Sequence, residues 1–168
     1  MSVDTPRMPT PPNKIRVLMV CLGNICRSPT AEAMLRRKAH EAGLDGRLEV
    51  DSAGTADYHV DSPPDRRAVA HGERRGLRMK HLRGRQVEPA DFDRFDFILA
   101  MDQDNLADLR QLRPAGARAK LALLMSYAPS AGSAQVPDPY HGGAEDFERV
   151  LDLAAAAADG FIAALARG

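Results

Sequence analysis

Cysteine is scarce in this chain, which has only two, Cys21 and Cys26, among 168 residues. Two cysteines this close together cannot form the disulfide framework of a small secreted domain. With five scattered histidines, they also do not supply an obvious structural zinc site, which needs four ligands. We therefore expect a reduced, cytoplasmic protein without a structural metal.

The chain also lacks surplus charge and long apolar runs. Its 23 Lys and Arg balance 23 Asp and Glu, so the formal net charge is zero, which argues against a dedicated nucleic-acid-binding protein. No run of about 18 apolar residues exists, so we expect no membrane span. The first 14 residues hold four of the 12 prolines and have no signal-peptide core. We interpret residues 1–13 as an extended lead-in and residues 14–168 as one domain.

Short apolar stretches alternate with helical patterns along that domain. The pattern predicts strands over residues 15–20, 48–52, 95–101 and 119–125. It predicts helices over residues 28–41, 62–76, 102–113 and 144–166, and one short helical turn over residues 88–92. Ser28 is the expected N-cap of the first helix, with Glu32 as an acid in its first turn. This alternation is typical of an α/β fold with a mostly parallel sheet.

The most informative segment is the loop between the first strand and the first helix, which reads CLGNICRSP from Cys21. Ligands of parallel sheets bind outside the carboxyl ends of strands, and a helix N-terminus offers unpaired N–H groups to an anion. Cys21 and Arg27 have five residues between them, enough for the backbone N–H groups to surround one centre. We expect a phosphate there, held by the loop and by both arms of the Arg27 guanidinium, with its phosphorus facing the Cys21 sulfur.

The other residues of this loop suit the same chemistry. Gly23 allows the backbone to approach the phosphate closely, and Asn24 tolerates a left-handed conformation. The helix end, Arg27 and the Ser28 hydroxyl favour a Cys21 thiolate at neutral pH, which would attack phosphorus and form a phosphocysteine. Because the chain has no G-x-x-x-x-G-K-[ST] motif, we expect no nucleotide, no magnesium ion and no other cofactor.

A proton donor for the leaving group is expected in the late segment Val136 to Tyr140, which reads VPDPY. Two prolines flank Asp138 and restrict its backbone. Asp138 is the best candidate for general acid in the first step and for general base toward water in the second.

These residues together resemble the low-molecular-weight protein tyrosine phosphatase family. The resemblance covers residues 14–166 and rests on CLGNICRSP, DSAGT, the Met101-Asp102 pair and the late DPY. It implies a single α/β domain with a four-stranded parallel sheet in order 2-1-3-4 and helices on both faces. It implies Cys21 as nucleophile, Arg27 as phosphate ligand and Asp138 as general acid. The substrate-binding residues that it implies are Leu22, Gly23, Asn24, Ile25, Cys26, Ser28, Tyr58 and Tyr140. The expected partner is a phosphotyrosine-containing protein, with no nucleic acid or membrane bound, and the expected state is a monomer.

The chain departs from the family pattern at two rim positions. Tyr58 stands where relatives often carry Trp, and His141 stands where Tyr is common, so the peptide preference is left open. Cys26 matches a cysteine that in some relatives forms a reversible disulfide with the nucleophile; its alternative role is packing. Asp102 is most simply a helix N-cap, with orientation of Arg27 as the alternative.

Three other functions fit the sequence less well. An arsenate reductase on this fold needs further cysteines downstream, and none follows Cys26. The corresponding loop of phosphoarginine phosphatases resembles this one but has Thr in place of Ile25. A phosphopeptide-binding module without activity would be expected to lack one of the three catalytic candidates. The basic stretch from Arg74 to Arg85 is interpreted as a solvated surface, with binding of acidic substrate segments as the alternative.

Overall fold

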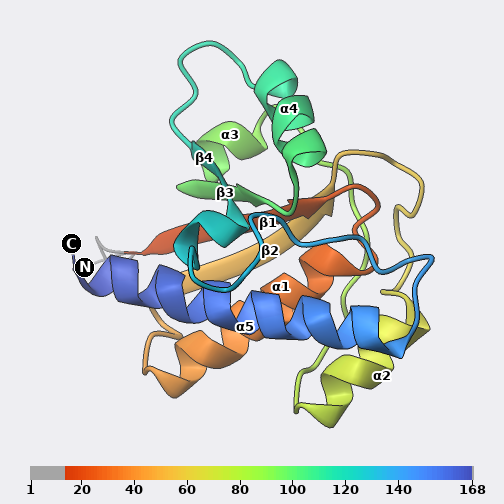
Figure 1. Cartoon of the computed structure of the whole chain (residues 1–168). Coiled ribbons are helices and arrows are strands. Elements are labelled where there is room, and N and C mark those ends of the chain that lie inside the picture. The colour runs from red at the N-terminus through yellow and green to blue at the C-terminus, as the bar shows by residue number, and fades with distance from the viewer. Residues whose placement is uncertain (1–13, 168) are drawn as a thin grey trace, which may run out of the picture.

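The computed structural model describes residues 14–167, so the lead-in expected over residues 1–13 lies outside the described residues. A four-stranded parallel sheet in the order β2-β1-β3-β4 forms the centre of the molecule, which confirms the expected topology (Figure 1). Its strands are β1 (Ile15–Cys21), β2 (Leu48–Gly54), β3 (Phe97–Ala100) and β4 (Lys120–Leu123).

Helices cover both faces of this sheet, as the resemblance implied (Figure 1). The long α5 (Ala144–Ala166) and α1 (Arg27–Glu41) pack together on one face, with α2 (Arg66–Arg74) against them. On the other face lie α3 (Asp91–Arg94) and α4 (Gln103–Leu112).

The central strand β1 explains why its sequence is a continuous apolar run. Alternate side chains of a strand point to opposite faces, and both faces of this sheet are covered. Val17 and Met19 therefore pack in the core beneath α1 and α5, whereas Leu18 and Val20 pack in the core beneath α3 and α4. All four are at most 1% exposed. The strand is thus anchored on both sides up to its carboxyl end.

The strand order reverses next to β1, because β2 lies on one side of it and β3 on the other. The segments that follow β1 and β3 therefore separate at this edge of the sheet, where open α/β folds bind ligands. The Met101 N–H donates to the Val20 carbonyl at 3.0 Å, which keeps the segment after β3 beside the start of the Cys21 loop.

The first helix begins differently from the sequence prediction. Helix α1 starts at Arg27, and its N-cap is Cys26, without a capping side-chain bond. The prediction that Ser28 is the N-cap is therefore wrong, because its hydroxyl bonds to the Cys21 sulfur. Glu32 correspondingly lies beyond the first turn, and it is buried.

Other boundaries shifted for local reasons. The helix predicted from residue 62 starts only at Arg66, since each of the prolines at positions 63 and 64 disfavours the helical conformation of the residue before it. Asp65 caps α2 by accepting from the Arg67 N–H at 2.8 Å. The strand predicted over residues 119–125 ends at Leu123 and continues as a 3₁₀ helix, Leu124–Tyr127. No helix within residues 14–167 is both long and apolar enough to cross a membrane.

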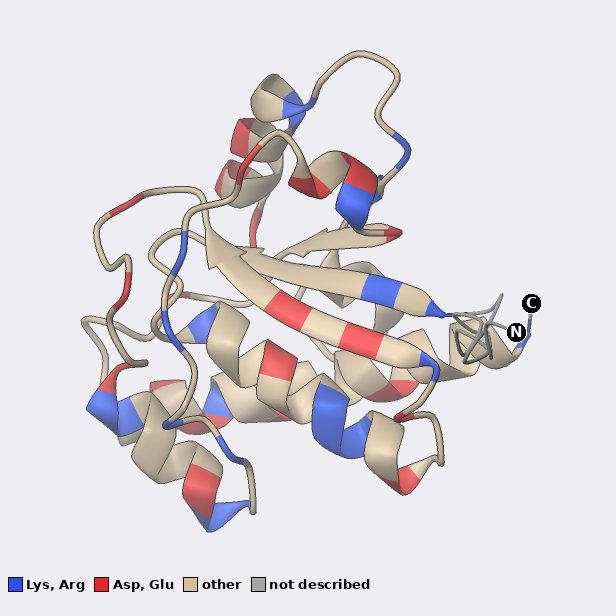
Figure 2. Cartoon of the chain, turned by 180° about the vertical axis from the view of Figure 1, so that it is seen from behind, with Lys and Arg blue, Asp and Glu red and all other residues tan. Residues whose placement is uncertain are grey.

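Charged residues of both signs are interspersed over the helices and loops (Figure 2). The basic stretch after α2 is not simply a solvated surface, because two of its arginines are paired. Arg75 bonds to Glu148 and Asp152 of α5 at 2.7 and 2.8 Å. Arg85 bonds to Asp51 and to the buried Asp91. These pairs hold the loop after α2 against the rest of the domain.

Candidate active site

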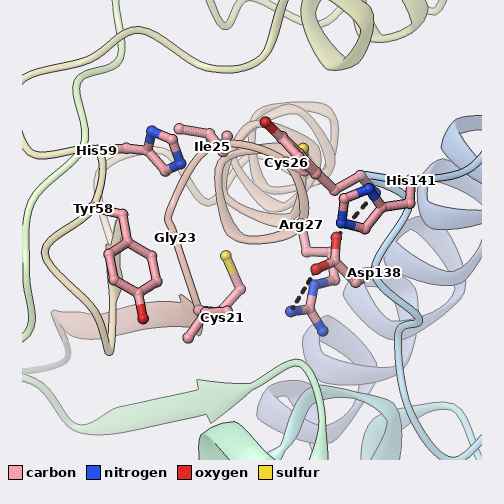
Figure 3. A pocket seen from close by; sticks show the side chains of 11 residues that line it. Cys21, Gly23, Ile25, Cys26, Arg27, Tyr58, His59, Asp138 and His141 are labelled. Carbon is pink, nitrogen blue, oxygen red and sulfur yellow. Dashed lines mark hydrogen bonds and ion pairs between the residues drawn. The ribbon is translucent and has the colours of Figure 1, made fainter.

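A pocket of about 290 Å³ opens at the carboxyl end of β1 (Figure 3). It is lined by Cys21, Leu22, Gly23, Ile25, Cys26, Arg27, Tyr58, His59, Asp138, Tyr140 and His141. The structure thus brings together the three catalytic candidates and six of the eight substrate-binding candidates. The other two, Asn24 and Ser28, are buried and do not line the pocket. His59 was not predicted as a site residue.

Asn24 gives the loop its shape. It has a positive φ of 59° and is 3% exposed. Its side-chain Nδ2 donates to Ser28 Oγ at 2.8 Å and to Ser52 Oγ at 3.0 Å, while its Oδ1 accepts from the Arg85 N–H at 3.1 Å. These bonds hold a non-glycine residue in the left-handed region, as the sequence predicted.

The Cys21 sulfur lies at the base of the pocket with two hydrogen-bond partners. The Asn24 N–H donates to Sγ at 3.3 Å, and Ser28 Oγ lies 3.0 Å from it. Ser28 Oγ accepts from the Asn24 amide, so its one proton is left for Sγ or for the Ala53 carbonyl, 3.5 Å away. Donation from the Asn24 N–H and from the Ser28 hydroxyl stabilises negative charge on the sulfur.

Arg27 is almost fully buried, at 3% exposure, so its charge needs partners. Nη1 donates to Asp102 Oδ2 at 2.6 Å and to the Val136 carbonyl at 3.1 Å. Asp102 Oδ1 accepts from the Asn105 N–H at 2.8 Å, which caps α4. Asp102 therefore has both roles that the sequence offered as alternatives.

Asp138 lies beside Arg27, and its carboxylate is 3.8 Å from Arg27 Nη2. Figure 3 shows Asp138 and Arg27 on one side of Cys21 and Tyr58 on the other. Asp138 Oδ1 accepts from the Tyr140 N–H at 3.1 Å, which fixes the carboxylate within its own turn. The carboxylate thus stands at the pocket, half exposed to water.

The rim of the pocket carries exposed apolar side chains. Tyr58 is 71% exposed, Tyr140 is 42% exposed and Leu22 is 41% exposed. The Tyr140 ring meets the His141 ring edge to face, with centroids 5.0 Å apart. The rim therefore offers aromatic and apolar surface to a group that enters the pocket.

Cys26 lines the same pocket but differs from Cys21 in its surroundings. Burial raises the pKa of the Cys26 thiol to about 12, with further increases from nearby Asp65 and Cys21. Cys26 is therefore a neutral thiol at physiological pH. Both cysteines are free. Within residues 14–167, no three His, Cys, Asp or Glu side chains are grouped so that they could hold a metal ion.

Comparison with known proteins identifies the family. A family model described as low molecular weight phosphotyrosine protein phosphatase matches residues 16–168. The chain belongs to this family. The low molecular weight phosphotyrosine protein phosphatase of Schizosaccharomyces pombe is 46% identical over 134 residues, which cover 79% of this chain and 85% of the relative.

Solved structures agree with the low molecular weight phosphatase assignment. A protein tyrosine phosphatase from Entamoeba histolytica superposes with a TM-score of 0.89 at 37% identity, covering 92% of this chain and 99% of that one. The Drosophila arginine phosphatase DARP superposes with a TM-score of 0.84 at 32% identity, covering 90% of this chain and 98% of that one. The fold is therefore shared by relatives named for different phosphorylated side chains.

Proposed function

We propose that this chain hydrolyses phosphotyrosine in proteins through a phosphocysteine on Cys21, with Asp138 as general acid. One observation carries the proposal: the Cys21 thiol, the Arg27 guanidinium and the Asp138 carboxyl line one pocket at the start of α1. This set supplies a nucleophile, an anion ligand and a proton donor. The family supports it, since its members are named for phosphotyrosine.

In the first step, the loop N–H groups and Arg27 hold the phosphate oxygens while Sγ attacks phosphorus opposite the ester oxygen. The S–P bond forms as the bond from phosphorus to the aryl oxygen breaks. Asp138, protonated at the start of this step, gives its proton to the departing oxygen. The products are a dephosphorylated tyrosine side chain and a phosphocysteine.

In the second step, the Asp138 carboxylate accepts a proton from water as the water oxygen attacks phosphorus. The S–P bond breaks, and inorganic phosphate leaves. The sulfur departs as a thiolate, which Ser28 Oγ and the Asn24 N–H stabilise. The enzyme thereby returns to its starting state.

The pocket walls favour an aryl ester over a phosphoarginine. Ile25 and the two rim tyrosines offer apolar and aromatic surface to a phenyl ring. A phosphoarginine would instead place a polar guanidino group against this apolar and aromatic surface.

The test is hydrolysis of an aryl phosphate in the presence of a metal chelator, comparing the wild type with Cys21→Ser. We expect full activity of the wild type under chelation and loss of at least about a thousandfold in the variant, since removal of a catalytic nucleophile can cost on the order of a millionfold in kcat. Activity that survives Cys21→Ser would overturn the proposal. A higher kcat/KM on a phosphoarginine peptide than on the matched phosphotyrosine peptide would show that phosphoarginine is the preferred substrate.

We also propose that residues 14–168 form one domain that acts as a monomer in the cytoplasm, without nucleic acid, membrane or cofactor. The scarcity of cysteine, two among 168 residues, supports such a compartment. Sedimentation of the purified protein at several concentrations tests the monomer directly, since a concentration-dependent mass would contradict it.

A further inference from the structure

The segment that carries Asp138 has no regular secondary structure between the 3₁₀ helix, which ends at Tyr127, and α5, which begins at Ala144. Its position near Cys21 therefore depends on individual bonds to the body of the domain. On one side of Asp138, the Val136 N–H donates to the Met101 carbonyl at 2.8 Å, and its carbonyl accepts from Arg27 at 3.1 Å. This anchor lies two residues before the candidate acid.

The anchor on the other side is made by Arg67. Its Nη2 donates to the Tyr140 carbonyl at 2.9 Å, two residues after Asp138. The Arg67 guanidinium also lies 5.5 Å from the Tyr140 ring centroid and 4.7 Å from that of Phe147, in the first turn of α5. Asp138 is therefore held between two fixed carbonyl groups, and Arg67 supplies the second bond.

Arg67 is itself fixed in direction. Its Nε donates to Asp65 Oδ1 at 3.1 Å, and its Nη2 donates to Asp65 Oδ2 at 3.0 Å, so two parallel bonds set the plane of the guanidinium. A lysine could not reproduce this arrangement, because its ammonium group is a point charge without a planar fork.

Asp65 in turn joins this arginine to the loop that starts at Cys21. Its backbone N–H donates to the Ile25 carbonyl at 2.8 Å. The path from Ile25 through Asp65 and Arg67 to Tyr140 thus connects the anion-binding loop with the segment of the acid by hydrogen bonds of 2.8 to 3.1 Å. The two halves of the candidate site share one support.

We propose that Arg67 is a positioning residue that sets the place of the Asp138 carboxyl relative to a phosphate on the Cys21 loop. The inference rests on the proposed function, because it requires Asp138 to be the general acid. Arg67 does not line the pocket and touches no reacting atom. Its loss therefore impairs proton transfer to the leaving group and leaves the nucleophile and the phosphate ligand in place.

This role has a signature that a general structural role lacks. Protonation matters most when the leaving phenol is weakly acidic, like tyrosine with its pKa of about 10. It matters little when the phenol is acidic enough to leave as an anion. A misplaced acid should therefore lower kcat/KM for poor leaving groups alone, because kcat/KM reports the step in which the ester bond breaks.

The experiment compares Arg67→Met and Arg67→Lys with the wild type on a series of aryl phosphates of rising phenol pKa. We expect both variants to lose about tenfold in kcat/KM at the tyrosine end of the series, since small misplacements of a catalytic group cost this much or more. We expect less than about twofold loss at the acidic end. Arg66→Met, at the exposed neighbouring position, is the matched control and should behave like wild type throughout.

The Asp138→Asn background separates the two proposals. In that background, adding Arg67→Met should lower kcat/KM no further with any leaving group. A uniform loss along the series, or a loss that adds to that of Asp138→Asn, would overturn the role of Arg67. If Asp138→Asn itself does not make kcat/KM depend more steeply on the pKa of the leaving phenol, then Asp138 is not the general acid and the proposed mechanism fails. Thermal unfolding of each variant confirms that the comparison is between folded proteins.

Discussion

Asp102 binds Arg27 through one carboxylate oxygen and caps helix α4 through the other. Oδ2 accepts from Arg27 Nη1 at 2.6 Å, and Oδ1 accepts from the Asn105 N–H at 2.8 Å. The arginine that follows β1 is therefore fixed to the helix that follows β3. This bond lies at the point where the strand order reverses, so it joins Arg27 to the segment after β3 at the edge where the candidate site opens.

Replacing Asp102 should separate these two contributions. An asparagine has one acceptor oxygen and no charge, but it remains a good N-cap, so Asp102→Asn should lower kcat/KM for an aryl phosphate by about tenfold or more. Asp102→Ala should show a similar loss of activity and lower the free energy of unfolding by a further ~1 kcal/mol, since the cap is also lost. Steady-state kinetics and urea unfolding measure the two effects. Full activity of Asp102→Asn would show that Arg27 does not need this partner.

The two cysteines of the pocket should differ sharply in reactivity. Because burial raises the pKa of Cys26 to about 12, its thiol stays protonated at neutral pH and is a poor nucleophile. We expect iodoacetamide to modify Cys21 first and to spare Cys26, and inorganic phosphate to slow the modification of Cys21. Fragmentation of the peptide that contains both residues measures the labelling of each. Equal labelling at neutral pH would contradict this difference, and a Cys21–Cys26 disulfide after mild peroxide would test the redox role of Cys26.

Glu32 should make folding stability depend on pH in an unusual direction for a carboxyl group. Burial raises its pKa above the ordinary value of 4.5, despite hydrogen bonds from Ser52 and Arg36. A folded-state pKa above the unfolded value means that its contribution is fully present below about pH 4.5. That contribution is lost as the pH rises through the folded-state pKa.

The variant Glu32→Gln removes this titration and leaves the other carboxyl groups in place. Between about pH 4 and about pH 8, the free energy of unfolding of the wild type should therefore fall relative to that of Glu32→Gln. Urea unfolding of both proteins at each pH gives the difference directly. Glu41→Gln, at the exposed end of the same helix, is the control. A wild-type-minus-variant difference that stays constant over this range would contradict the prediction.

The sequence was most informative where function and local structure depend on neighbouring residues. The apolar run before Cys21 predicted a strand buried on both faces, and the spacing of Cys21 and Arg27 predicted a loop that curls around an anion. For the strand and the loop, the signal lies within a few positions along the chain. Asp138 was predicted from its flanking prolines together with the family pattern that links DPY to the distant Cys21 loop, and the structure places it at the same pocket.

Features that depend on distant contacts were missed. Ser28 is a good N-cap by propensity, but the bond between its hydroxyl and Cys21 Sγ overrides that preference. His59 reaches the pocket because its loop is tied to a segment some 25 residues further on, through Asp61 N–H to the Gly84 carbonyl and Gly84 N–H to the Ser62 carbonyl, both at 2.8 Å. No periodicity or motif near these residues predicts such hydrogen bonds between distant segments.

The phosphocysteine on Cys21 is the central claim, and trapping it is the most direct test. Asp138→Asn should slow attack by water, while an aryl phosphate with an acidic phenol keeps the first step fast. After mixing and rapid denaturation, mass spectrometry should find close to one phosphoryl group per chain, located on Cys21. The same experiment with Cys21→Ser added should show none. A phosphoryl group on any other residue, or hydrolysis that continues without Cys21, would contradict the account.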